Sequence, residues 1–168
     1  MKTIYLNRHA KSSWNRPYTS DFERGLNKRG NTNAEYMSKR FALETKDVVI
    51  VSSPAVRALR TAIYFAEALD IENQNIKQVD LIYGASAREM LRLIQSFDDS
   101  WESVILFGHN PTFSELANLL DHSFNDHMVT CARVKIACEV KSWTHIIPDI
   151  GHVEYHDYPR LYAEMKDL

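Results

Sequence analysis

Long hydrophobic runs are absent from this 168-residue sequence, and cysteine is scarce. No apolar stretch approaches the roughly 20 residues that a membrane-spanning helix needs. Residues 1–10 have one lysine and too short an apolar core for a signal peptide. The two cysteines, Cys131 and Cys138, favour buried free thiols in a reducing compartment over a disulfide. These absences predict a cytoplasmic protein that does not insert into a membrane.

A large excess of charge is also absent, because the formal net charge is only −2. This balance argues against nucleic acid as the main partner, although arginines clustered on one face would not show in the sum. The composition, 45% hydrophobic and 25% charged, is that of a soluble globular protein. Repeats, linkers and low-complexity segments are not visible, so we expect a single domain spanning residues 1–168.

Strand-like and helix-like segments alternate along most of the chain. Short apolar or β-branched runs predict strands at residues 4–6, 48–51, 76–81 and 104–107, and the different pattern at 133–140 and 144–156 predicts antiparallel or edge strands. Helical spacing of apolar residues predicts helices at about residues 27–43, 54–69, 86–97, 113–120 and 161–165, with Asn27 and Ser86 as N-caps. This alternation predicts an α/β sandwich.

Arg8 and His9 directly follow the first predicted strand. Ligands bind at the carboxyl ends of strands in open α/β sheets, so this pair lies where a site is expected. Arginine presents a planar fork of donors to phosphate oxygens, and histidine is a nitrogen nucleophile that is largely unprotonated near neutrality. On the dipeptide alone, a surface or capping pair is an equally good interpretation.

Two further strand ends have the same character. Arg57 falls in the first turn of a predicted helix, where the macrodipole disfavours a cation unless it faces an anion. Arg60, one turn later, is interpreted as a solvated or ion-paired residue. His109 follows Gly108 after the apolar strand 104–107, and the alternative for it is a structural histidine at a strand end. Glycine at this point permits a tight turn or a close approach of the backbone to a ligand.

The segment Arg8-His9-Ala10-Lys11-Ser12-Ser13-Trp14-Asn15 resembles the R-H-G-x-S-x-W-N signature of the histidine phosphatase superfamily. Ala10 replaces the usual glycine, a change that small SixA-type members share. The stretch from Ser53 to Ala62 resembles the S-x-x-x-R-A-x-x-T-A element of the same family.

The resemblance implies a fold and a site. The fold is a phosphoglycerate mutase-like three-layer α/β/α sandwich with a mostly parallel sheet and an antiparallel edge strand. His9 is implied as the phosphorylated residue, Arg8 and Arg57 as phosphate-binding arginines, and His109 as the second catalytic histidine. We also expect Lys11, Ser12 and Asn15 of the signature to contact substrate.

The family's proton donor is a carboxylate four residues before a glycine, and Gly84 points back to Asp80. Asp80 is therefore the candidate acid. Asp is a methylene shorter than the usual Glu, and the alternatives are Asp21, Glu23 or no dedicated acid, as in SixA-type enzymes.

His152, Glu154 and His156 would share one face of a strand, which raises a metal site as an alternative. No further strong ligand is near these residues in sequence, so we expect no metal. We expect no cofactor either, since arginines supply the positive charge that phosphoryl transfer needs. His122, His127 and His145 are interpreted as surface residues.

The short length and short loops predict an open pocket that suits a phosphorylated side chain on a protein. The sequence is similar to SixA-type phosphohistidine phosphatases, which implies hydrolysis of phosphohistidine on a phosphotransfer or phosphocarrier protein, with the enzyme a monomer or weak dimer. Two alternatives stay open: a broad-specificity phosphatase of small phosphate esters, and a non-catalytic phosphate-binding module. A mutase would need a more closed site.

Overall fold

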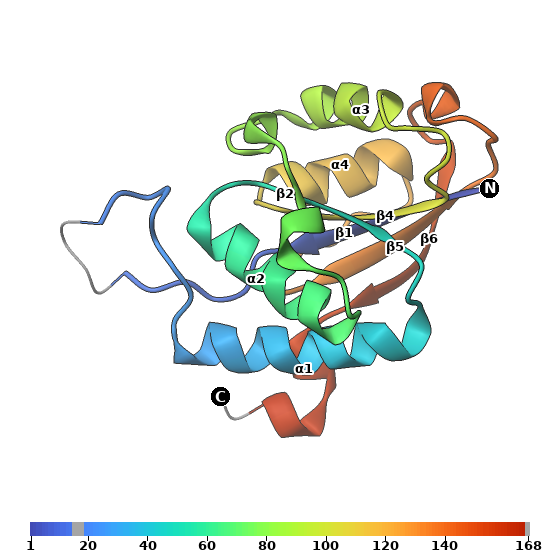
Figure 1. Ribbon diagram of the computed structural model, residues 1–168. Helices are drawn as coiled ribbons and strands as arrows, with labels where there is room; N and C mark the ends of the chain where they lie inside the picture. The colour runs from blue at the N-terminus through green and yellow to red at the C-terminus, as the bar shows by residue number, and fades with distance from the viewer. Residues whose placement is uncertain (15–18, 167–168) are drawn as a thin grey trace.

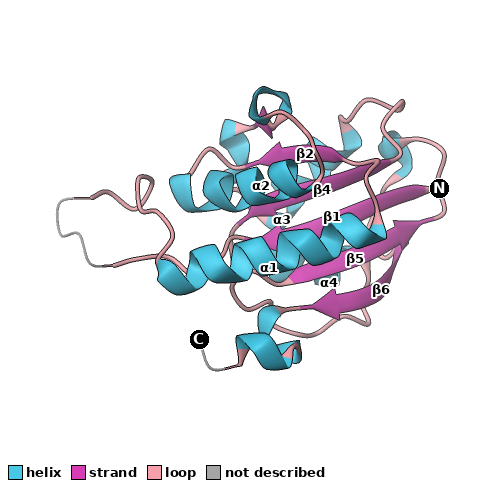
Figure 2. Cartoon of the chain, turned by 60° about the horizontal axis from the view of Figure 1, so that its bottom comes forward, coloured by secondary structure: helices cyan, strands magenta, loops and turns pink. Residues whose placement is uncertain are grey.

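A six-stranded mixed sheet forms the middle layer of the computed structural model, which describes residues 1–14 and 19–166. The strand order is β3-β2-β4-β1-β5-β6 (Figures 1 and 2). The strands are β1 (Lys2–Arg8), β2 (Val49–Ser52), β3 (Lys77–Gln78), β4 (Ser103–Gly108), β5 (Arg133–Cys138) and β6 (Gly151–Asp157). Strands β3, β2, β4 and β1 pair in parallel, whereas β5 pairs antiparallel with both β1 and β6.

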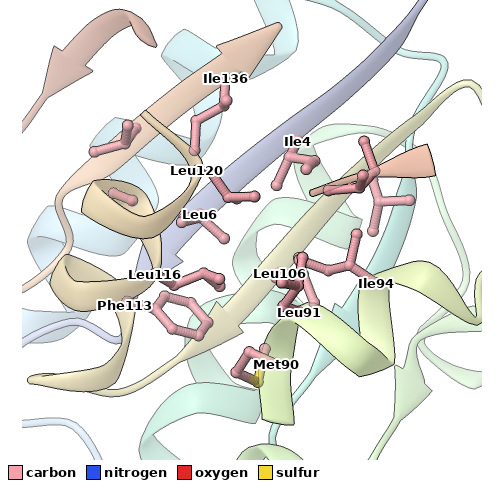
Figure 3. Packing of buried hydrophobic residues seen from close by; sticks show 14 of the residues in the cluster. Ile4, Leu6, Met90, Leu91, Ile94, Leu106, Phe113, Leu116, Leu120 and Ile136 are labelled. Carbon is pink, nitrogen blue, oxygen red and sulfur yellow. The ribbon is translucent and has the colours of Figure 1, made fainter. Parts of the chain in front are cut away.

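Two helices cover each face of the sheet (Figure 1). The helices are α1 (Lys28–Glu44), α2 (Val56–Ala68), α3 (Ala87–Gln95) and α4 (Thr112–Leu120). Side chains alternate along a strand, so Ile4 and Leu6 of β1 pack on the α3/α4 face and Tyr5 packs on the α1/α2 face. Figure 3 shows the first face, where Leu6 lies near Leu116 of α4. The predicted three-layer α/β/α sandwich is confirmed.

Helix α1 approaches the first loop of the chain closely. Asn27 caps it, because its side chain accepts a hydrogen bond from the Gly30 amide at 2.8 Å. A Cβ atom on Gly30 would lie 2.0 Å from the carbonyl oxygen of Lys11, so only glycine permits this contact. The predicted N-cap at Ser86 is also present, and it forms a capping box with Glu89. Local sequence signals therefore set both helix starts correctly.

The predicted elements after residue 70 are less accurate. The segment 76–81 gives only the two-residue β3 and a 3₁₀ turn at Asp80–Ile82. The first part of 144–156 is not a strand: Pro148 has no amide to donate and Asp149 has a φ of 61°, so β6 starts only at Gly151. The final segment forms 3₁₀ turns at Pro159–Leu161 and Ala163–Met165 instead of one helix.

The pairing of β5 with β6 contains a β-bulge. Lys135 pairs with Tyr155, but the next residue, Ile136, pairs with Val153. The extra residue shifts the alternation of β6, so His156 lies opposite Val134 and His152 lies opposite Ala137, on the other face of the sheet. The prediction that the two histidines share a face is therefore wrong.

Within the described residues, no group of three or more histidine, cysteine or acidic side chains is arranged to hold a metal ion. None of the helices in this part of the chain has both the length and the apolar character to cross a bilayer. Cys131 and Cys138 are free and buried. Burial raises the pKa of each thiol to about 12.

Candidate active site

The sheet register brings three strand ends to one edge. Arg8 at the end of β1 pairs with Gly108 at the end of β4, and Ser52 at the end of β2 pairs with Phe107. The backbone continues these contacts beyond the strands, because the amide of His9 donates to the Gly108 carbonyl at 3.0 Å. The residues that follow each strand are therefore neighbours, as expected for the carboxyl edge of a parallel sheet.

Gly108 lies where two elements meet tightly. A Cβ atom at this position would lie 2.4 Å from the ring of Phe113 in α4. The glycine is thus required because the following helix packs closely against the end of the strand, where a larger residue would clash. His109 is held next to it, with its ring centroid 5.4 Å from that of His9.

His9 is buried with one ring nitrogen committed. Nδ1 lies 2.8 Å from the carbonyl oxygen of Ala10, which only accepts, so Nδ1 carries the proton and Nε2 keeps its lone pair. Burial is the main cause that lowers the pKa of His9 to about 3, with smaller contributions from His109, Arg57 and Arg8. The ring is therefore neutral near pH 7 and has a free nucleophilic nitrogen.

His109 is oriented by Ser53, a residue that the sequence analysis did not single out. The Ser53 Oγ lies 2.8 Å from Nε2 of His109 and accepts a hydrogen bond from the amide of Ala55. Nε2 is the one acceptor described for the serine hydroxyl, so we infer that the hydroxyl donates to Nε2 and that the ring proton is on Nδ1. Burial and the charge of Arg57 lower the pKa of His109 to about 4. Nδ1 is buried and has no protein partner among the described residues.

Arg8 and Arg57 leave further donors unpaired. Arg8 donates from Nη1 to the Met128 carbonyl at 3.0 Å, and both Nη atoms of Arg57 donate to Asp21. In the described part of the chain, the Nε atoms of both arginines are buried without a partner. Burial and the nearby charge of Arg57 lower the pKa of Arg8, as expected for two cations held close together. Three buried N–H groups around His9 thus lack acceptors, which is an unusual state for a protein interior.

Asp21, and not Asp80, is the carboxylate that contacts the residues of the site. Its carboxylate accepts from Arg57 at 3.1 Å and from the Tyr83 hydroxyl at 2.7 Å. Tyr83 in turn packs its ring edge-to-face with His109 at 5.6 Å. The hydrogen bond from Tyr83 is the largest cause that lowers the pKa of Asp21 to about 2, so the group is ionised at neutral pH.

Asp80 does not join this cluster. It is exposed on the 3₁₀ turn, and no described hydrogen bond or ion pair connects its side chain to Arg8, His9, Arg57 or His109. The spacing to Gly84 therefore indicates a turn beside the site, but the structure does not bring Asp80 into contact with the cluster. Tyr83, immediately before Gly84, is the side chain of this turn that reaches His109.

The other three predicted substrate contacts have mixed positions. The Ser12 hydroxyl is buried and donates to the Gly25 carbonyl at 2.8 Å, which ties the backbone at Gly25 to the segment that follows β1. Lys11 is exposed. Asn15 lies outside the described residues. Ser12 of the signature therefore stabilises the loop beside the site through a hydrogen bond to the backbone.

A cavity of about 770 Å³ is lined by Asp21, but not by Arg57, His9 or His109. The cations that line it are Arg24, Lys28 and Arg60, and Trp14 stacks over Arg24 with the guanidinium carbon 3.7 Å from the ring centroid. Trp14 is 75% exposed, so a large apolar surface is available at the entrance.

Comparisons with known proteins agree with this geometry. Residues 4–81 match the model of the histidine phosphatase superfamily (branch 1). A crystal structure from Agrobacterium tumefaciens, provisionally named phosphohistidine phosphatase SixA, is 27% identical with a TM-score of 0.77, and the match covers 94% of this chain and 98% of that chain. No curated protein sequence matches.

Two more distant structures share the fold. The protein histidine phosphatase SixA complexed with tungstate is 16% identical with a TM-score of 0.78, and the match covers 94% of this chain and 97% of that one. A mycobacterial glucosyl-3-phosphoglycerate phosphatase is 13% identical with a TM-score of 0.65, and the match covers 92% and 97% of the two chains. The family model over residues 4–81, the fold and the SixA structural neighbours thus agree in their similarity to the histidine phosphatase superfamily, and they support a phosphatase.

Proposed function

We propose that the enzyme removes phosphate from phosphohistidine on a protein through a phosphoryl group carried on His9. The observation that carries this proposal is the set of buried, unpaired N–H groups around a neutral imidazole: Arg8 Nε, Arg57 Nε and His109 Nδ1. Buried donors without acceptors cost stability, so they are retained where a ligand supplies the acceptors. A phosphoryl group has three equatorial oxygens that suit this role.

The reaction proceeds in two displacements. Nε2 of His9 attacks phosphorus in line, and the P–N bond to the substrate imidazole breaks as the new P–N bond forms. Arg8, Arg57 and His109 donate to the oxygens and stabilise the charge that they carry in the transition state. Water then attacks the phosphorylated His9 and releases inorganic phosphate, which returns His9 to its neutral form with Nδ1 still bonded to Ala10.

The available acids favour a phosphohistidine over a phosphate ester. Asp80 is exposed and outside the cluster, and Asp21 is ionised at neutral pH. An alkoxide leaving group needs a proton from a strong, positioned acid, whereas an imidazole is protonated readily by water near neutrality. A site without a neutral carboxyl group therefore assists a P–N bond sufficiently and a P–O ester poorly.

The cavity beside Asp21 supports a protein as the carrier of the phosphohistidine. Its exposed Trp14, Lys28 and Arg60 offer an apolar and basic surface next to the site, and the carboxylates of Asp21 and Glu23 line the same cavity. Such a surface suits an acidic segment that flanks a phosphorylated histidine.

The test is phosphate release from a phosphohistidine-bearing protein, measured beside a panel of sugar phosphates and an aryl phosphate. Wild type, His9→Ala and the control His122→Ala, which removes an exposed histidine, are assayed together. We expect wild type and His122→Ala to prefer phosphohistidine by orders of magnitude and His9→Ala to be inactive. Brief reaction with ³²P-labelled substrate should leave an acid-labile, alkali-stable label on wild type and none on His9→Ala.

Two results would contradict the proposal. Equal or faster turnover of the small esters would reject phosphohistidine as the preferred substrate. An active His9→Ala variant would reject the covalent mechanism.

A further inference from the structure

Asp21 holds both terminal nitrogens of Arg57. Nη1 donates to the Asp21 backbone carbonyl at 2.7 Å, and Nη2 donates to the Oδ2 carboxylate oxygen at 3.1 Å. Among the described contacts, Nε is the one nitrogen of Arg57 that is buried without a partner. A guanidinium group can bind phosphate through two nitrogens, but in the free enzyme both Nη atoms of Arg57 are already bonded to Asp21.

The carboxylate of Asp21 is itself fixed from three sides. Tyr83 donates to the same Oδ2 at 2.7 Å, and Arg24 donates to Oδ1 at 3.1 Å. The Asp21 side chain is 47% exposed, whereas that of Arg57 is 7% exposed. The negative charge thus stands at the border with solvent, directly behind a buried arginine, and its neutralisation would open no cavity in the core.

We propose that Asp21 is a positioning residue that sets the affinity of the site for phosphate, by orienting Arg57 and by opposing the charge of the bound oxyanion. The inference rests on the proposed function only in taking Arg57 as a ligand of the phosphoryl group. Two guanidinium groups around one dianion would otherwise hold the product tightly. Binding that stabilises the product as much as the transition state slows its release and so limits turnover.

The direction of the effect follows from electrostatics. A carboxylate one guanidinium away from a phosphate dianion repels it, and partial burial weakens the screening by water. Removal of this charge also frees Nη2 of Arg57 for a second hydrogen bond to the oxyanion. Both changes strengthen phosphate binding, and an effect on the order of tenfold is expected for one charge at the solvent border.

The experiment is calorimetric titration of inorganic phosphate into wild type, Asp21→Asn, Asp21→Glu and Glu23→Gln. We expect the Kd of phosphate to fall about tenfold in Asp21→Asn and to stay within about threefold of wild type in Asp21→Glu, which keeps the charge. Glu23→Gln is the matched control, because it removes an equal charge from the same exposed loop without a described contact to Arg57. We expect it to bind phosphate as wild type does.

Turnover gives the second readout. Asp21→Asn should show a lower kcat together with a lower KM and stronger inhibition by phosphate, since product release becomes slower. A merely structural role would raise KM and weaken phosphate binding instead. The melting temperature of each variant is measured first to show that it is folded.

The outcomes separate this inference from the proposed function. Unchanged or weaker phosphate binding in Asp21→Asn would overturn the inference, whatever the enzyme hydrolyses, and so would a wild type that binds no phosphate. Tighter binding in Asp21→Asn with no hydrolysis of phosphohistidine by wild type would support the role of Asp21 and reject the proposed substrate.

Discussion

Two arginines with different surroundings lie on neighbouring strands of this protein, the half-buried Arg8 and the buried Arg133. Arg8 ends β1, and Arg133 starts β5 opposite the preceding residue of β1, Asn7. Arg133 has a partner for every nitrogen: the Tyr155 hydroxyl at 3.1 Å, Asn7 at 3.5 Å and Asp157 at 3.3 Å. Arg8 has a bond from Nη1 to a carbonyl and a buried Nε without a described partner.

The difference distinguishes a structural cation from one that is kept ready for a ligand. Arg133 also lies over the ring of Phe41, with its guanidinium carbon 4.7 Å from the ring centroid, so its surroundings are complete without any further molecule. Arg8 has an unmet hydrogen bond in a buried position, which costs stability. Arg133 is buried, whereas Arg8 is only half-buried, and its unmet donor together with its place next to His9 marks it as the arginine that is available to a ligand.

The largest expected effect is on stability, at Arg133. Arg133→Ala leaves the carboxylate of Asp157 partly buried without its partner, and we expect the free energy of unfolding to fall by about 3–5 kcal/mol. Activity per folded molecule should stay within about threefold of wild type. Urea unfolding and kcat/KM, each corrected for the folded fraction, provide the measurements. A large loss of activity in the folded fraction would contradict the purely structural role of Arg133.

Arg8→Met should give the opposite pattern. Loss of one donor to the transferring phosphoryl group lowers kcat/KM by about 100- to 1000-fold. The free energy of unfolding should be unchanged or higher, because methionine fills similar space without an unmet hydrogen bond. The assay is steady-state hydrolysis of a phosphohistidine substrate beside urea unfolding. Strong destabilisation of Arg8→Met would show that its burial is structural after all.

The neutral histidines of the site make stability depend on pH. The folded-state pKa values of His9 and His109, about 3 and 4, lie below the ordinary value of about 6.5, so the unfolded chain binds more protons below pH 6.5. Their contribution is full above pH 6.5 and is lost as the pH falls toward 4. We expect a loss on the order of 1 kcal/mol for each histidine between pH 6.5 and pH 5.

Urea unfolding of wild type and His109→Gln at pH 7.5, 6.5 and 5 measures this contribution. The variant should lose less stability than wild type over the same range. Identical slopes in the two proteins would contradict the assignment of a neutral, buried His109.

The smallest expected effect is at Ser53. Ser53→Ala removes the hydroxyl that orients His109, so the Nδ1 proton is no longer fixed toward the site, and we expect kcat to fall about tenfold. Ser52→Ala is the matched control: this serine is equally buried, but its hydroxyl bonds the carbonyl of Ser53 instead of the histidine. An equal loss in both variants would point to a packing effect of either serine.

The central site was predictable because its residues directly follow apolar strands. Once 4–6 and 104–107 are recognised as strands, the sheet edge places Arg8, His9 and His109 together whatever the loops do. Arg57 was indicated by its place in the first turn of a helix, which starts at Val56, and the resemblance to the family motif added its phosphate-binding role.

The surrounding residues were not predictable in the same way. Asp21, Ser53 and Tyr83 are placed by side-chain hydrogen bonds between loops far apart in the sequence, which no local pattern encodes. Asp80 lies outside the cluster for the same reason, since spacing to a glycine identifies a turn but not which side chain faces inward. The bulge in β6 likewise depends on pairing with β5 and has no signal within β6 itself.

The backbone around His9 is tied on both sides and has a consequence for hydrogen exchange. Its amide donates to Gly108 of β4, its carbonyl accepts from the amide of Cys131, and the next amide, of Ala10, donates to Thr61 of α2. The His9 amide can exchange with deuterium only when several elements separate at once, so its protection should approach that of global unfolding. His9, the proposed phosphate acceptor, is thus fixed in place, and alignment for in-line attack must come from the way the substrate enters.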